Sequence, residues 1–179
     1  MKLFTSGLLS IFVISFTFSC SSTESVTPTS NTSSSSIFPG WYQSSEFTAD
    51  SLSYTGYATA IASDSLLAVK RAEVQARAHL ESNIAELTED IRTSLEESGS
   101  TSATNTDFII ILRTAHSKVE SAGTLSMNSV KKEDGYYRGF ASVDISKEEL
   151  VKVLEAGFTG HPRYWGEFSG AAEFVKLFN

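Results

Sequence analysis

The stretch "LLAVKRAEVQARAHLESNIAELTEDIRTSL" at residues 66–95 decides the fold. Its apolar residues recur at steps of three or four, which places them in one stripe along a continuous helix. Alanine fills the first half of the stripe, and leucine and isoleucine fill the second half. The alanine half can approach a sheet closely, whereas the other half needs deeper burial. The stripe consists of Ala68, Ala72, Ala76, Leu80, Ile84, Leu87, Ile91 and Leu95.

Both ends of this helix carry terminal signals. Ser63-Asp64-Ser65 predicts the start, because short polar side chains cap the first free N–H groups of a helix. Gly99 predicts the stop. A helix from Asp64 to Ser98 would be about 50 Å long at 1.5 Å per residue. That exceeds the diameter of a small domain, so we expect its far end to bend, to fray or to reach a partner.

Residues that alternate in character predict strands on either side of the helix. Residues 52–61 place Leu52, Tyr54, Gly56, Ala58 and Ala60 on one face and Ser53, Thr55, Tyr57 and Thr59 on the other. A second strand begins at Leu125 and Met127 and ends near Lys132, and Asp134-Gly135 marks a hairpin turn. The returning strand, 136–145, points Tyr137, Ala141, Val143 and Ile145 one way and Tyr136, Arg138, Phe140 and Ser142 the other.

Residues 107–120 fit two patterns. Phe108, Ile111, Leu112, Ala115 and Val119 follow helical spacing, while the run "FIIIL" is typical of a strand. The helical pattern takes in more apolar positions and Asp107 can cap it, so we predict a helix.

The rest of the chain predicts shorter helices. Ser146 and Glu149 form a capping box, with Gly157 as the stop. Residues 158–179 are rich in aromatic side chains, and 171–178 fit one more short helix. We therefore expect an α+β fold: a small antiparallel sheet of about three strands, packed by the long Ala-rich helix, with further shorter helices. The α+β domain would span 38–157, followed by the aromatic-rich segment 158–179.

The N-terminus has the features of an export signal. Lys2 supplies a positive start, residues 3–18 are uncharged, and small Ser19 precedes Cys20, the only cysteine in the chain. The uncharged run of about 16 residues is short of the ~20 that a membrane-spanning helix needs. An ordinary cleaved signal would not favour a cysteine at the cut. We predict a lipoprotein signal peptide at 1–19 and a lipid on Cys20.

The segment after the signal is predicted to be a tether. Residues 20–37 comprise the lipidated Cys20 and a Ser/Thr-rich tract with too little apolar surface to offset the entropy of ordering. The approach to the cut, Thr17-Phe18-Ser19, fits the bacterial lipoprotein pattern best at its last position. That pattern, with Ser21 rather than aspartate after the cysteine, implies the outer membrane, with the domain facing the periplasm or the surface.

Charge and cysteine content exclude some classes of protein. The net charge is −7 over the full chain and becomes −8 once Lys2 leaves with the signal. An acidic surface repels phosphate backbones, which argues against nucleic-acid partners. With Cys20 lipidated, no thiol remains for a disulfide, a Cys–metal site or thiol catalysis. We expect no cofactor.

Four stretches together resemble the LPP20 family of bacterial lipoproteins. They are "PGWY" at 39–42, "YTGYATA" at 54–60, the Ala-rich helix from Ala68 to Leu80 and "KKEDGYYRGFASVDI" at 131–145. The resemblance covers roughly residues 39–146. It implies a compact α+β domain with a structural or assembly role at the outer membrane, with envelope proteins or a second copy as partner. The resemblance implies no catalytic residues in this chain.

The side chains that could carry chemistry give one hint of binding. His79, His116 and His161 lack the spacing of a metal site, and the chain contains none of the short catalytic motifs with a recognised mechanism. We therefore expect a protein that is not an enzyme. The pairs Trp41-Tyr42 and Tyr164-Trp165 form the candidate binding surface, because aromatic rings stack on sugars or anchor protein interfaces; core packing is the plainer reading. The alternative function is a module that binds peptidoglycan or another glycan.

Overall fold

The computed structural model describes residues 37–178, which belong to one unit spanning 36–179. The predicted signal peptide, Cys20 and the tether up to residue 36 lie outside the described residues. The elements in chain order are β1 (Phe47–Ala49), β2 (Ser53–Ala62), α1 (Ser65–Glu97), α2 (Thr106–Ser117), α3 (Val119–Ala122), β3 (Thr124–Glu133), β4 (Tyr136–Ser146), α4 (Lys147–Gly157), α5 (Pro162–Ser169) and α6 (Ala172–Phe178).

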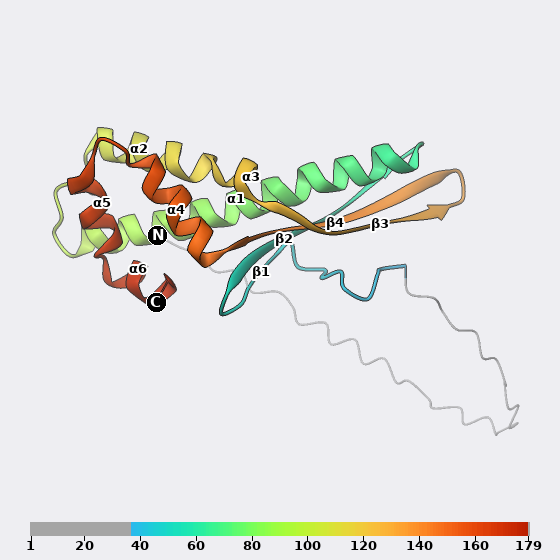
Figure 1. The fold of residues 1–179 in the computed structure, drawn as a ribbon, viewed down its shortest axis with the longest axis horizontal. Coiled ribbons are helices and arrows are strands. Elements are labelled where there is room, and N and C mark those ends of the chain that lie inside the picture. Colours follow the sequence, from blue (N-terminus) through green and yellow to red (C-terminus); the bar gives the residue numbers. More distant parts are fainter. Residues whose placement is uncertain (1–36, 179) are drawn as a thin grey trace, which may run out of the picture. The chain divides into compact units, whose positions relative to one another are not determined.

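The fold is α+β, with one antiparallel sheet in the order β1-β2-β4-β3 (Figure 1). The predicted count of about three strands is wrong by one, because β1 pairs with β2 over only three residues and has no alternating pattern of its own. The predicted hairpin is confirmed, and Gly135 takes a φ of +83° at its turn. Leu52, expected on the apolar face of β2, lies before the strand and is exposed.

The long helix begins and ends close to the predicted residues. The Asp64 side chain accepts a hydrogen bond from the Leu67 N–H at 2.9 Å, which satisfies one of the free donors of the first turn. Ser98 caps the C-terminus, and Gly99 follows with a φ of +88°. The two halves of α1 have different partners: its alanine half lies on β2 and β4, and its far half lies beside the C-terminal helices (Figure 1).

The buried stripe of α1 differs from the prediction at one position. Thr88 is buried, and Leu87 lies at the margin of the core. Buried positions from Ala68 to Thr88 recur every four residues. Each such step rotates around the helix axis by about 40° more than one full turn. The stripe therefore winds around the helix and moves from the sheet towards α2. The Thr88 hydroxyl donates to the Ala85 carbonyl at 2.9 Å, so its burial leaves no polar atom unsatisfied.

The helical prediction for 107–120 is confirmed, with two corrections nearby. Asn105, rather than Asp107, caps α2, and its side chain accepts from the Asp107 N–H at 2.8 Å. Gly157 does not stop α4 in a left-handed conformation. A Cβ at Gly157 would come within 2.2 Å of the Ala115 Cβ, so this glycine allows α4 to pack closely against α2. The residue with positive φ after α4 is Gly160.

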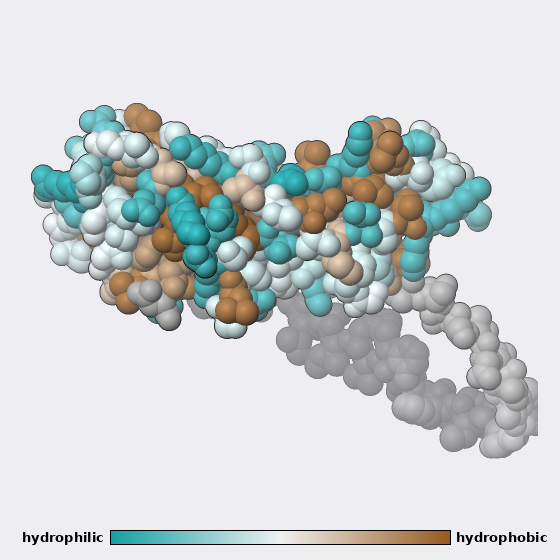
Figure 2. All heavy atoms as spheres, in the orientation of Figure 1, coloured by the Kyte–Doolittle hydropathy of each residue, from teal (hydrophilic) through white to brown (hydrophobic). Residues whose placement is uncertain are grey.

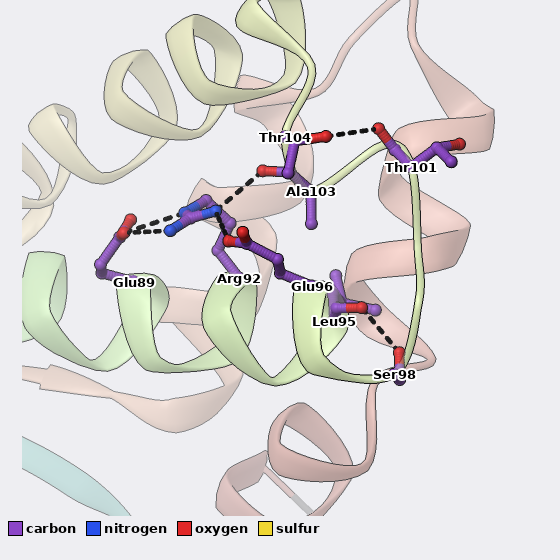
Figure 3. Close-up of polar contacts among 8 residues, drawn as sticks. All are labelled: Glu89, Arg92, Leu95, Glu96, Ser98, Thr101, Ala103 and Thr104. Carbon is purple, nitrogen blue, oxygen red and sulfur yellow. Dashed lines mark hydrogen bonds and ion pairs between the residues drawn. The ribbon is translucent and has the colours of Figure 1, made fainter.

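The loop after α1 is held by one arginine. The Arg92 guanidinium bonds to Glu89 and Glu96 on its own helix and donates to the Ala103 carbonyl at 2.9 Å (Figure 3). The Arg92 side chain is only 15% exposed. It therefore joins α1 to the loop that leads into α2.

The two faces of the sheet are covered unequally. α1 covers the face that contains Ala58 and Ala141. The opposite face is partly covered by the residues before β1, where the Phe38 and Tyr42 rings pack against Phe140 at centroid distances of 5.9 and 5.3 Å. Phe140 is fully buried as a result.

Candidate functional site

The structure separates the two predicted aromatic pairs. Trp41 and Tyr42 lie on the sheet face opposite α1, where Tyr42 meets Tyr57 at 6.2 Å. Tyr164 and Trp165 lie on α5 and pack against the Phe cluster of the core. Among residues 37–178, no ring contact joins one pair to the other. The four side chains therefore do not form one surface: Tyr42 borders one open groove, and Tyr164 borders a separate one of about 310 Å³.

We call this groove the Tyr42 groove. It has a volume of about 350 Å³ and lies between the chain leading into β1, the exposed edge of β2 and one flank of α1. It exists because β1 pairs with β2 only as far as Phe47 and Gly56, with one further bond from the Tyr57 N–H to the Glu46 carbonyl at 2.8 Å. Its lining residues are Tyr42, Ser44, Glu46, Tyr57, Ala58, Thr59, Gln75 and His79.

Within residues 37–178, the backbone of Thr59 presents an unused donor and acceptor to the groove. In an antiparallel strand, successive residues point their N–H and C=O groups to opposite sides. The backbone N–H and C=O of Tyr57 point towards the β1 side, because the N–H bonds to the Glu46 carbonyl. The N–H and C=O of Thr59, two residues further, point to the same side, but β1 does not extend far enough to pair with them. The Thr59 side chain is occupied, since its hydroxyl donates to the Gly139 carbonyl.

His79 adds a ring with a defined tautomer. Its Nδ1 lies 2.7 Å from the Tyr57 carbonyl, which can only accept, so Nδ1 carries the proton. In the neutral ring, Nε2 is then an acceptor. It lies 3.9 Å from a Glu46 carboxylate oxygen, too far for a direct hydrogen bond. Two ligand hydroxyls can therefore donate here, one to each group.

The Tyr42 phenol stays neutral near pH 7. Burial raises the pKa of Tyr42, and the nearby Glu46 carboxylate raises it further. The hydroxyl therefore keeps its proton and can donate. Together the groove offers a carboxylate, an imidazole acceptor, the Gln75 amide, a phenol and an open strand edge beside two aromatic rings.

A larger open groove of about 600 Å³ lies between α1 and α2. Glu86, Glu89 and Asp90 are among its lining residues, as is His116, whose Nδ1 bonds to Glu81 at 2.8 Å. Within the described part of the chain, no group of three or more His, Cys, Asp or Glu side chains is arranged to hold a metal ion.

Exposed apolar side chains gather on the N-terminal half of α1 (Figure 2). Leu66 is 62% exposed, Val74 is 60% exposed, and Leu67 borders a hollow of about 360 Å³ with Val74. We call Leu66, Leu67 and Val74 the α1 apolar surface. None of the helices between residues 37 and 178 has the length and apolar character to cross a membrane.

Sequence reasoning identified Tyr42 but missed Glu46, Thr59, Gln75 and His79 as its neighbours. The alternation of residues 53–61 predicts the strand but not where its partner β1 ends. The open edge depends on that end point. The spacing of Gln75 and His79, four residues apart on one helix flank, was the available signal.

Comparison with known proteins gives no relative. No protein-family model, no curated protein and no solved structure matches this chain.

Proposed function

We propose that this protein is a non-enzymatic lipoprotein, anchored to the outer membrane through Cys20, whose α+β domain takes part in cell-envelope assembly by protein–protein contact. The sequence of residues 1–20 supports the anchor. The resemblance of 39–146 to the LPP20 family supports the assembly role. Two acyl chains or more give stable attachment to a membrane.

The α1 apolar surface is the observation that carries the contact role. Leu66 and Val74 are more than half exposed on a helix whose other face already covers the sheet. Apolar side chains grouped on a surface mark places where another molecule binds. A partner of this surface would be an envelope protein or a second copy of the chain.

Crosslinking in cells tests the contact role. The full-length chain is expressed in bacteria, crosslinked and recovered with its partners. We expect Val74→Asp to abolish the crosslinked species. Ile110→Asp is the matched control, because Ile110 is 56% exposed but lies on α2. Equal crosslinking by both variants, or recovery of a strict monomer without partners, contradicts the role.

Mass spectrometry tests the anchor. We expect the mature chain to begin at Cys20 and to carry its acyl groups on that residue. An intact segment 1–19, or a Cys20 without lipid, contradicts the anchoring proposal.

A second candidate function is the binding of peptidoglycan or another glycan, and the Tyr42 groove favours it. Sugar-binding sites combine aromatic faces with polar groups that fix the ligand, and the groove has both. Retention of the protein on purified sacculi tests this candidate. We expect Tyr42→Ala to lower retention, and a wild-type protein that is not retained contradicts it.

A further inference from the structure

The open edge of β2 at Thr59 offers one peptide-like pairing position. Thr59 directs both its N–H and its C=O into the Tyr42 groove, on the same side as the Tyr57 N–H that bonds to Glu46. A neighbouring strand would fill such a position with one residue's C=O and N–H. The same two groups occur in any secondary amide that approaches in the plane of the sheet.

The position is too short for a strand. On one side the Tyr57 N–H is already bonded to Glu46. On the other side the Ile61 carbonyl accepts a hydrogen bond from the Arg71 guanidinium at 3.3 Å. Between these two occupied groups, Thr59 is the residue whose N–H and C=O both lack a partner among the described residues. The geometry therefore suits a ligand with a single amide better than an extended peptide.

The walls of the groove suit a hydroxylated ring. Tyr42 and Tyr57 provide aromatic surface, which packs on the C–H face of a pyranose. Glu46 and the His79 Nε2 are acceptors 3.9 Å apart, placed for hydroxyl donors. The Gln75 side chain makes no hydrogen bond within residues 37–178 and adds a donor and an acceptor. The volume of about 350 Å³ is at the small end for ligand sites, which favours one sugar residue.

We propose that the Tyr42 groove binds an N-acetylated amino sugar, with the acetamido group paired to the Thr59 backbone and the pyranose ring against Tyr42 and Tyr57. The acetamido group supplies the single amide, and the sugar supplies the hydroxyls. This inference rests on the glycan-binding candidate above and names its ligand class. It does not depend on the assembly role.

Titration of the purified full-length protein in detergent tests the inference. The probe is N,N′-diacetylchitobiose, and the readouts are the dissociation constant and the NMR shift of the Thr59 amide. Cellobiose is the control ligand, because it keeps the rings and hydroxyls but lacks the acetamido groups. We expect saturable binding with a shift at Thr59, and at least tenfold weaker binding of cellobiose.

Two variants place the ligand in the groove. Gln75 and Glu46 are exposed, so Gln75→Ala and Glu46→Gln leave the core intact. We expect each to weaken binding of the diacetylated probe by about five- to tenfold. Lys70→Ala is the control on the same helix; it lies outside the groove and should leave the dissociation constant unchanged.

Three results would overturn the inference: no saturable binding of the probe, equal affinity for cellobiose, or affinity that is unaffected by both groove variants. A tri-alanine peptide that shifts the Thr59 amide where the sugar does not would also overturn it, in favour of strand docking. If sacculi retain the protein while the probe fails, glycan binding stands and the acetamido assignment falls. If sacculi do not retain it either, both fall together.

Discussion

Gly139 on β4 lies directly beneath Ala68 of α1: a Cβ at Gly139 would come 2.3 Å from the Ala68 carbonyl oxygen. Gly56 on β2 has the same relationship to Ala76, also at 2.3 Å. The alanine half of α1 thus touches the backbone of the sheet at two glycines on adjacent strands. A larger side chain on either side of this contact would push the helix away from the sheet.

Replacing Gly139 by alanine should therefore destabilise the fold. The added methyl meets backbone atoms, which cannot move aside as a flexible side chain can, and overpacking of this kind costs about 1 to 3 kcal/mol. We expect the free energy of unfolding, measured in urea, to fall by about that amount or more. Gly166→Ala is the matched control. Gly166 lies within α5 with open space around its Cα, so alanine should raise stability by up to about 1 kcal/mol. A neutral Gly139→Ala would contradict the close contact.

The Arg92 contacts predict a local as well as a global effect. Arg92→Lys keeps the charge but loses the planar fork that reaches Glu89, Glu96 and the Ala103 carbonyl together. We expect the free energy of unfolding to fall by about 1 to 2 kcal/mol, with faster amide exchange in the loop at 98–105. Arg163→Ala serves as the control, because its ion pair with Glu167 is on the surface and Arg163 is 80% exposed; it should change stability by less than about 1 kcal/mol. Equal effects would argue against a special role for Arg92.

Local signals explain what the sequence predicts correctly. The alternation from Ser53 to Ala62 and the Asp64 cap depend on neighbours within a few residues. Both can therefore be predicted from the local sequence. The role of Gly157 depends on Ala115, which is 42 positions earlier, and no local pattern contains that contact. As a glycine near the end of a helix, it reads from sequence as a stop signal.

The candidate site is only partly predictable for the same reason. An aromatic pair at Trp41 and Tyr42 is visible in the sequence, but the groove beside it depends on where β1 stops pairing. Pairing over three residues leaves no periodic signal. The second aromatic pair looks the same in the sequence, yet Trp165 packs into the Phe cluster and the half-buried Tyr164 borders a different groove. Sequence shows that rings are available, and the fold decides which of them border open space.

Phe140 should behave as a core residue although it points away from α1. It is fully buried beneath Phe38 and Tyr42. We expect Phe140→Ala to lower the free energy of unfolding by about 3 kcal/mol or more. Ile61→Ala is the control on the same face of the sheet; Ile61 is 47% exposed, and its replacement should cost less than about 1 kcal/mol. Similar small effects for both would mean that residues 38–42 do not cover the sheet in solution.

The hairpin should lose stability in acid through Glu133. The Arg138 guanidinium bonds to this carboxylate at 2.6 Å, and the Tyr136 hydroxyl also donates to it. The bonds from Arg138 and then Tyr136 lower the pKa of Glu133. A carboxyl whose pKa is lower in the folded state stabilises the fold fully above its unfolded pKa, about 4.3 for Glu, and loses that contribution as pH falls through the folded value.

Comparison of wild type with Glu133→Gln checks this sign. We expect wild type to be the more stable at pH 6, by urea unfolding, and the difference to shrink steadily below about pH 4.3. The amide shifts of the β3–β4 hairpin should titrate over the same range in wild type and not in the variant. A stability difference that stays constant from pH 6 to pH 3 would show that the carboxylate charge does not hold the hairpin, and that its contacts with Arg138 and Tyr136 contribute through shape alone.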